Sequence, residues 1–106
     1  MSDLASRLFD FSGKTVLVTG GSRGLGYQMV KAFAEQGADT IIVSRKLDAC
    51  EEVAEEVRAL GRRALAISAH CGKWDEIDAM IEKAYAQFPK IDILINNAGM
   101  SPRVPS

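Results

Sequence analysis

The stretch Thr19-Gly20-Gly21-Ser22-Arg23-Gly24-Leu25-Gly26 decides the fold of this chain. It follows an apolar run at residues 15–18 and opens a segment whose apolar residues recur at helical spacing, which predicts a strand, a glycine-rich turn and a helix. Gly20 permits a tight turn with positive φ, Gly24 lets a pyrophosphate approach the backbone, and Gly26 lets the helix pack closely on the strand. The helix N-terminus then offers free N–H groups to phosphates. The residues expected to line this turn are Gly20, Ser22, Arg23, Gly24, Leu25 and Gly26.

The rest of the chain alternates apolar runs with amphipathic segments. Strands are predicted at residues 15–19, 39–43, 64–68 and 91–95, and helices at about 25–36, 48–60 and 75–88. This alternation is typical of a parallel sheet with crossover helices, an α/β fold. We predict a partial Rossmann-type doubly wound sheet with strand order 3-2-1-4, in which a ligand binds at the carboxyl ends of the first and fourth strands.

Local signals refine these boundaries. Gly37 is expected to end the first helix, and Asp48 to cap the start of the second. Tyr85 falls in the apolar stripe of the third helix, which predicts a structural role. Residues 1–12 are interpreted as a lead-in with room for one helical turn, and residues 100–106 as an irregular tail of one domain.

The composition is that of an ordinary globular domain. The chain has 106 residues, of which 47% are apolar and 25% charged, and its net charge of −1 gives no reason to expect nucleic acid or an anionic membrane as partner. It has no apolar run long enough to cross a membrane and no secretory signal at its start. Cys50 and Cys71 lack metal-site spacing, so we expect free thiols, a cytoplasmic location and no metal.

The end of the second strand indicates which dinucleotide the site prefers. A carboxylate there usually binds the free ribose hydroxyls of NAD, but this chain has Ser44 followed by Arg45. Arg45 offers a charge-assisted, forked contact to a 2′-phosphate, and Arg23 approaches from the glycine turn. We therefore predict NADP as the cofactor, with NAD less favoured. The alternative is that both arginines are solvated surface residues.

A second motif, Asn96-Asn97-Ala98-Gly99, follows the fourth strand directly. Together with the T-G-x-x-x-G-x-G pattern of the turn it resembles the short-chain dehydrogenase/reductase family, from about Phe11 to Met100. The resemblance implies that Asn96 helps to hold the central strands together, and that Ala98 and Gly99 let the backbone lie against the cofactor. It also implies hydride transfer between nicotinamide and a carbonyl or secondary alcohol. Arg23 and Arg45 match positions that mark NADP preference in this family.

The chain departs from the family pattern after the third strand. The family commonly has an aspartate there that contacts adenine, but the matching residue here is His70. Its ring is a candidate contact to adenine, and Cys71 a candidate backbone contact. A loop histidine with little role is an equally good interpretation.

The family's Ser, Tyr and Lys catalytic set is missing. Tyr27 and Lys31 formally match Y-x-x-x-K, but both lie in the helix that follows the glycine turn, so we interpret the match as a coincidence on a surface face. The chain thus resembles the N-terminal half of a longer enzyme, with no catalytic residues of its own and with pairing into homo-oligomers expected only for a full-length form.

Three other functions remain open. These are a non-catalytic dinucleotide-binding module, a fragment that binds nothing, and a methyltransferase-like domain. Ser44-Arg45 argues against the last, since S-adenosylmethionine favours an acidic residue at that position.

Overall fold

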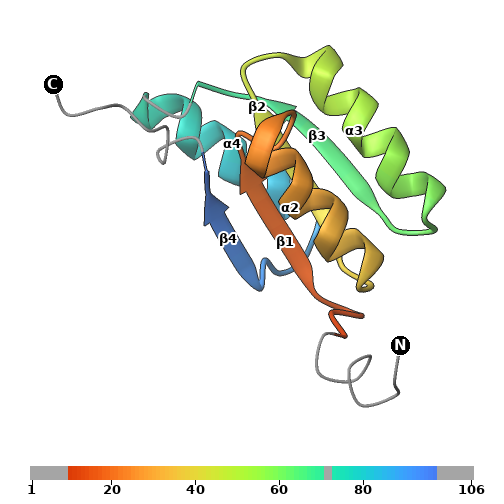
Figure 1. Ribbon diagram of the computed structural model, residues 1–106. Coiled ribbons are helices and arrows are strands. Elements are labelled where there is room, and N and C mark those ends of the chain that lie inside the picture. The colour runs from red at the N-terminus through yellow and green to blue at the C-terminus, as the bar shows by residue number, and fades with distance from the viewer. Residues whose placement is uncertain (1–9, 71–72, 98–106) are drawn as a thin grey trace, which may run out of the picture.

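The computed structural model describes residues 10–70 and 73–97. The elements run in the order β1 (Thr15–Thr19), α2 (Gly24–Glu35), β2 (Asp39–Ser44), α3 (Leu47–Ala59), β3 (Ala64–Ser68), α4 (Trp74–Gln87) and β4 (Ile93–Asn96). The strands form one sheet in the order β3-β2-β1-β4, and every neighbouring pair is parallel (Figure 1). The predicted doubly wound α/β fold is therefore confirmed, strand order included.

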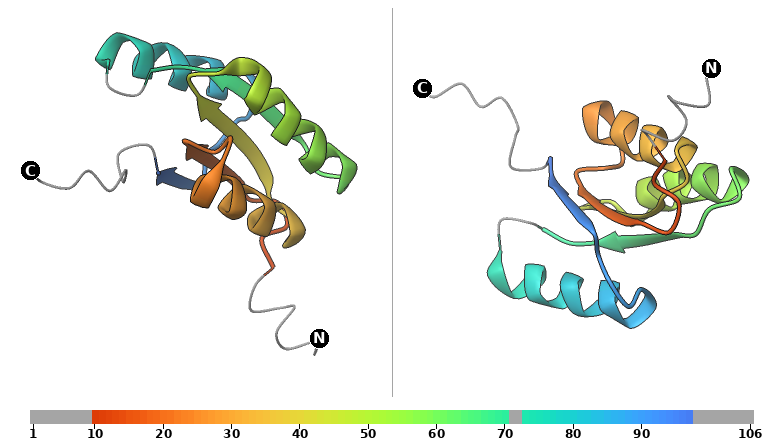
Figure 2. Two further views of the ribbon diagram at one scale, coloured as in Figure 1. Left: turned by 45° about the horizontal axis from the view of Figure 1, so that its top comes forward. Right: turned by 90° about the horizontal axis from the view of Figure 1, so that it is seen from below.

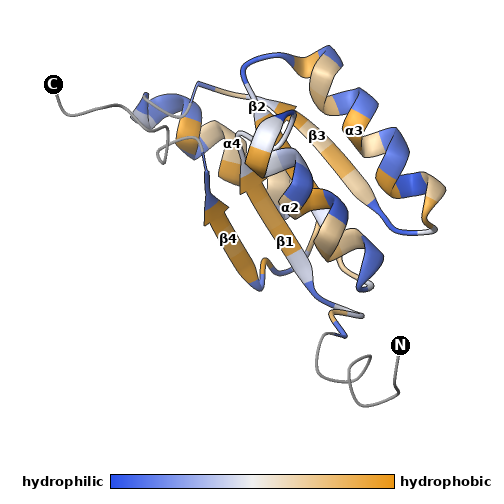
Figure 3. Cartoon of the chain, in the orientation of Figure 1, coloured by the Kyte–Doolittle hydropathy of each residue, from blue (hydrophilic) through white to orange (hydrophobic). Residues whose placement is uncertain are grey.

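The sheet lies between two helical layers, with α2 and α3 on one face and α4 on the other (Figure 2). Because side chains alternate along a strand, Val16 and Val18 of β1 pack toward α2 and α3, while Leu17 packs toward α4. All five residues of β1 are buried, and the strands are apolar along most of their length (Figure 3). The continuous apolar runs in the sequence follow from this burial on both faces.

The register of the strands brings their carboxyl ends to one edge. Thr19 lies opposite Val43 of β2 and opposite Asn96 of β4, and Ser44 lies opposite Ser68 of β3. The glycine turn, the Ser44-Arg45 segment and the start of the asparagine motif therefore gather at the same end of the sheet.

Two of the predicted boundaries are wrong for reasons that the structure shows. α3 begins at Leu47 with Lys46 at its N-cap, so Asp48 lies inside the first turn, where its Oδ1 accepts the Ala49 N–H at 3.1 Å. β4 begins at Ile93 rather than at residue 91, because Asp92 pairs with Thr15: its carboxylate accepts the Thr15 N–H at 2.8 Å and its own N–H donates to the Thr15 carbonyl.

The apolar stripe of α4 is only partly buried. Met80 and Ala84 face the core, but Tyr85 is 51% exposed and Trp74 is 82% exposed. Tyr85, for which the sequence predicts a structural role, therefore lies at the exposed side of the stripe, which is wider than the strip of helix that contacts the sheet. Of the predicted lead-in, residues 1–9 lie outside the described residues, as does the whole of the 100–106 tail.

Candidate cofactor-binding site

The glycine turn leaves β1 at the carboxyl edge of the sheet. Gly20 has φ +67°, the conformation that the sequence predicts for the tight turn. Its N–H donates to the Val43 carbonyl at 2.7 Å, and the Gly21 N–H approaches the same carbonyl at 3.3 Å. The turn is thus tied to the end of β2, beside Ser44.

Gly24 and Gly26 are required for different reasons. Gly24 has φ +62°, and a Cβ built there would meet no atom within 4 Å, so the space beside it is open to a ligand. At Gly26 a Cβ would collide with the carbonyl of Gly20 and would lie 2.7 Å from Nδ2 of Asn97. The helix therefore packs against the turn and against Asn97, not only against the strand.

The N-terminus of α2 is free of side-chain caps. Its N-cap, Arg23, has extended backbone and makes no capping hydrogen bond, and the first turn contains no acidic residue. The first N–H groups and the positive end of the helix dipole therefore remain unneutralised by the helix's own side chains. Ser22 is half-buried at this point, and Leu25 is 61% exposed beside it.

β1 and β4 are joined at their carboxyl ends by a side-chain hydrogen bond. The Thr19 hydroxyl donates to Oδ1 of Asn96 at 3.0 Å, and Oγ1 lies 3.3 Å from the Ile95 carbonyl. Asn97, which the sequence analysis did not single out, donates from Nδ2 to the Gly20 carbonyl at 3.2 Å. Only its place inside the quoted asparagine motif signalled that it belongs to the site.

At the end of β2 the hydroxyl of Ser44 is used by the protein itself. It accepts the Lys46 N–H at 3.2 Å and lies 3.0 Å from the thiol of Cys50. Arg45 and Arg23 are exposed, and no hydrogen bond or ion pair joins either guanidinium to another residue of the described chain. Both charges are therefore available to an anion.

His70 follows β3 at the same edge of the sheet. It is half-buried, and its backbone N–H donates to Oε1 of Glu76 at 2.7 Å. The remaining predicted contacts, Cys71, Ala98 and Gly99, lie outside the described residues.

Comparison with known proteins decides the family. The model of the short chain dehydrogenase family matches residues 14–106. The chain belongs to the short-chain dehydrogenase/reductase family. This membership argues against the methyltransferase-like alternative.

Individual relatives give the same result. The 2-dehydro-3-deoxy-D-gluconate 5-dehydrogenase of Escherichia coli is 43% identical over 95 residues, which are 90% of this chain and 37% of the relative. A hydroxysteroid dehydrogenase from E. coli superimposes with a TM-score of 0.82 at 30% identity, covering 86% of this chain and 39% of that one. The L-sorbose reductase of Gluconobacter frateurii, solved with NADPH and L-sorbose, gives a TM-score of 0.77 at 31% identity, with 81% and 33% covered. The chain spans little more than a third of the length of the curated relatives it matches.

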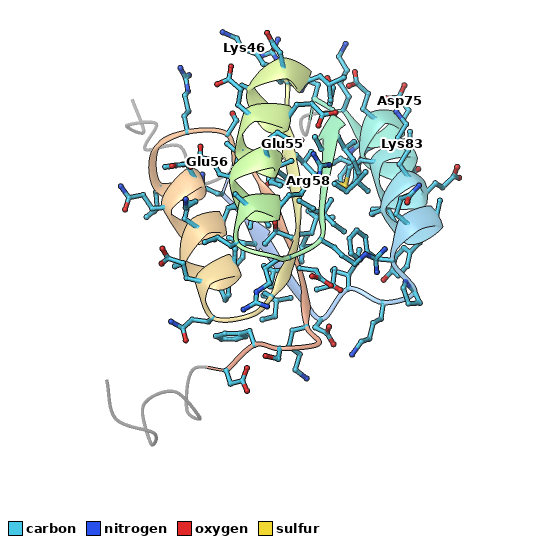
Figure 4. The ribbon with its side chains drawn as sticks, turned by 90° about the vertical axis from the view of Figure 1, so that its right-hand side faces the viewer. Lys46, Glu55, Glu56, Arg58, Asp75 and Lys83 are labelled. Carbon is cyan, nitrogen blue, oxygen red and sulfur yellow. The ribbon has the colours of Figure 1, made fainter. Side chains whose placement is uncertain are left out.

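The Y-x-x-x-K pair of this chain is engaged by a residue of α3. The Tyr27 hydroxyl donates to Oε1 of Glu56 at 2.6 Å, and Nζ of Lys31 contacts the same oxygen at 3.1 Å. Glu56 reaches from α3 into the space beside α2 (Figure 4). The pair is thus part of a tie between two helices, a role that sequence reasoning missed.

The hydrogen bonds between Tyr27, Lys31 and Glu56 shift the pKa values of all three groups. The hydrogen bonds from Tyr27 and then Lys31 lower the pKa of Glu56, and the carboxylate in turn raises the pKa of Tyr27 and of Lys31. The neutral form of Tyr27 is therefore favoured, with its hydroxyl hydrogen donated to Glu56.

A separate hollow of about 340 Å³ lies at the opposite, amino end of β3. Its guanidinium groups are held by backbone carbonyls: Arg58 donates to Ala64, and Arg63 donates to Gln87 while stacking on Phe88. The glycine turn is the better candidate site for an anion, because it combines an uncapped helix N-terminus with open space beside Gly24.

Other classes of site find little support in residues 10–70 and 73–97. No group of three His, Cys, Asp or Glu side chains there is arranged to hold a metal ion. Within the same residues, no helix has the length and apolar character needed to cross a membrane.

Proposed function

We propose that this chain is the NADP-binding portion of a short-chain oxidoreductase. The observation that carries the proposal is the uncapped N-terminus of α2, which begins at Gly24 directly after a turn with open space beside it. Backbone N–H groups at such a terminus bind phosphate oxygens, and the helix dipole favours their negative charge. The pyrophosphate of a dinucleotide would lie there.

Arg23 and Arg45, which are exposed and make no ion pair within the described residues, support NADP over NAD. A 2′-phosphate adds negative charge next to the adenosine ribose, and a guanidinium can donate two parallel hydrogen bonds to it. Arg45 follows β2 and Arg23 belongs to the turn that is bonded to the end of β2, so both approach the same end of the sheet. The L-sorbose reductase that superimposes on this chain was solved with NADPH, which is consistent with the proposal.

The reaction is that of the family. The bound cofactor supplies hydride transfer to a carbonyl, or from a secondary alcohol. In this chain the glycine turn holds the phosphates, and the Thr19–Asn96 and Gly20–Asn97 hydrogen bonds hold the crevice in shape. We expect a cytoplasmic protein, with homo-oligomers formed by a full-length form.

We expect residues 1–106 by themselves to bind the cofactor without turnover. Tyr27 and Lys31 are the one Y-x-x-x-K match in the sequence, and both are committed to Glu56. A non-catalytic binding module is the alternative function, and this commitment is the observation that favours it.

Titration of NADPH and NADH into the 106-residue chain tests the proposal, with binding followed by calorimetry. NADPH should bind more tightly, and the double variant Arg23→Ala/Arg45→Ala should remove most of the difference while leaving NADH binding nearly unchanged. Arg58→Ala, at the far end of the sheet, is the matched control. Equal affinities for the two cofactors in the unaltered chain would refute the NADP assignment, and failure to bind either would refute the dinucleotide site.

A further inference from the structure

The backbone of Arg45 is held from the neighbouring edge strand. The hydroxyl of Ser68, the last residue of β3, donates to the carbonyl oxygen of Arg45 at 3.2 Å. One residue further on, the Ala69 N–H donates to the carbonyl of Ser44 at 2.9 Å. The segment that leaves β2 is therefore tied to β3 by one side-chain and one backbone hydrogen bond.

A second tie comes from Ser44 itself. Its hydroxyl accepts the Lys46 N–H at 3.2 Å and so closes a small turn around Arg45. The same hydroxyl lies 3.0 Å from the Sγ of Cys50, which is fully buried and donates to the Ile67 carbonyl at 3.8 Å. The core beneath the turn therefore fixes the rotamer of Ser44.

These contacts hold the backbone at Arg45 and do not touch its side chain. The Arg45 side chain is exposed and has no partner among the described residues, so its long, flexible stem is positioned only by the backbone from which it starts. A guanidinium that begins from a fixed backbone loses less freedom when it closes on a phosphate, and binds more tightly for that reason. The side chain of Ser68 is exposed, and the hydrogen bond described for its hydroxyl is the one to the Arg45 carbonyl.

We propose that Ser68, supported by Ser44, is a positioning residue that sets the preference for the 2′-phosphate by fixing Arg45. This inference rests on the proposed NADP site and adds to it a determinant that acts through the backbone of Arg45. Ser68 lies outside the glycine motif and the asparagine motif, and the contact exists because β2 and β3 are paired in register.

A double-mutant cycle on the 106-residue chain tests the inference, with the dissociation constants of NADPH and NADH as readouts. Ser68→Ala should weaken NADPH about three- to tenfold, the loss expected for one hydrogen bond, and should leave NADH unchanged. In an Arg45→Ala background the same substitution should have no further effect on NADPH, because Ser68 acts through Arg45. Ser68→Thr keeps the hydroxyl and should restore most of the affinity.

Each contrary result has a separate meaning. If Ser68→Ala weakens both cofactors equally, or weakens NADPH as much without Arg45 as with it, Ser68 is only structural and the inference is wrong. If Arg45→Ala leaves the NADPH to NADH ratio unchanged, the proposed 2′-phosphate contact fails and the inference fails with it. Ser12→Ala, an exposed serine at the opposite end of β1, should change neither constant, and urea unfolding of each variant confirms that it is folded.

Discussion

Asn97 donates a hydrogen bond from its side-chain Nδ2 to the carbonyl oxygen of Gly20, 3.2 Å away. The two residues are 77 positions apart in the sequence, and the bond joins the segment after β4 to the turn after β1. It lies at the switch point of a doubly wound sheet, where the crevice opens between the two central strands. The Asn97 side chain therefore holds the turn that we propose for the pyrophosphate against the segment after β4.

Replacing Asn97 with Ala should weaken both the fold and the site. The Gly20 carbonyl would lose its partner, so we expect the free energy of unfolding to fall by about 1 kcal/mol. NADPH and NADH should be weakened alike, because the turn contacts the part of the dinucleotide that the two cofactors share. Urea unfolding and calorimetric titration measure the two effects.

The matched control for this change is Gln28→Ala, which removes an exposed amide from α2. It should alter neither stability nor binding by a measurable amount. If Asn97→Ala behaves like Gln28→Ala, the hydrogen bond to Gly20 contributes nothing and the account of the crevice is wrong.

Gly26→Ala should disrupt the turn. The added methyl group would collide with the Gly20 carbonyl, so the helix must move away from the turn, at a cost of about 1–3 kcal/mol in the free energy of unfolding. Gly61→Ala is the comparison, because Gly61 has φ +83° but open space around it, so the variant carries backbone strain without a collision. Gly26→Ala should lose NADPH binding in calorimetry, whereas Gly61→Ala should keep it; loss of binding in both would point to general destabilisation.

The fold could be predicted from the sequence because its signals are local. The runs at residues 16–18 and 41–43 are apolar at every position, as burial on both faces of a parallel sheet requires. The strand order then followed from the handedness of the crossovers and the position of the glycine turn. The glycines were readable for the same reason, since positive φ at Gly20 and Gly24 is a property of single residues.

The contacts that shape the site could not be predicted in this way. Asn97 meets Gly20, Ser68 meets Arg45 and Glu56 meets Tyr27 only after strands and helices far apart in sequence are packed together. Neither the residue types nor their spacing in the sequence reveals which residues form these pairs. The start of β4 was predicted wrongly for the same reason, because Asp92 is hydrogen-bonded to Thr15 of another strand.

Thr40→Val should make the protein more stable. Thr40 is fully buried in β2, and its hydroxyl has no hydrogen-bond partner among the described residues. Valine has nearly the same shape without the buried hydroxyl, so we expect the free energy of unfolding to rise by about 1 kcal/mol. Thermal unfolding followed by circular dichroism measures the change.

Thr19→Val gives the contrast for this prediction. Thr19 is also buried in a strand, but its hydroxyl donates to Asn96, so the same substitution should destabilise the chain. A loss of stability in both variants would show that the Thr40 hydroxyl is satisfied in solution.

Asp92 should make stability depend on pH in the acid range. The Thr15 N–H, which donates to its carboxylate, and the nearby Lys90 lower the pKa of Asp92 below its ordinary value of 3.8. A carboxylate with a lowered pKa in the folded state stabilises the protein above its unfolded pKa, and this contribution is lost as the pH falls through the folded pKa.

In Asp92→Asn the amide oxygen still accepts the N–H but carries no charge and does not titrate. The unaltered chain should therefore be more stable than this variant at about pH 6, and the difference should close toward about pH 2. Urea unfolding at several pH values measures it, with Asp78→Asn on the exposed side of α4 as the control that should show no such closing difference. A gap between the chain and Asp92→Asn that stays constant from about pH 6 to about pH 2 would mean that the charge of Asp92 does not hold β4 to β1.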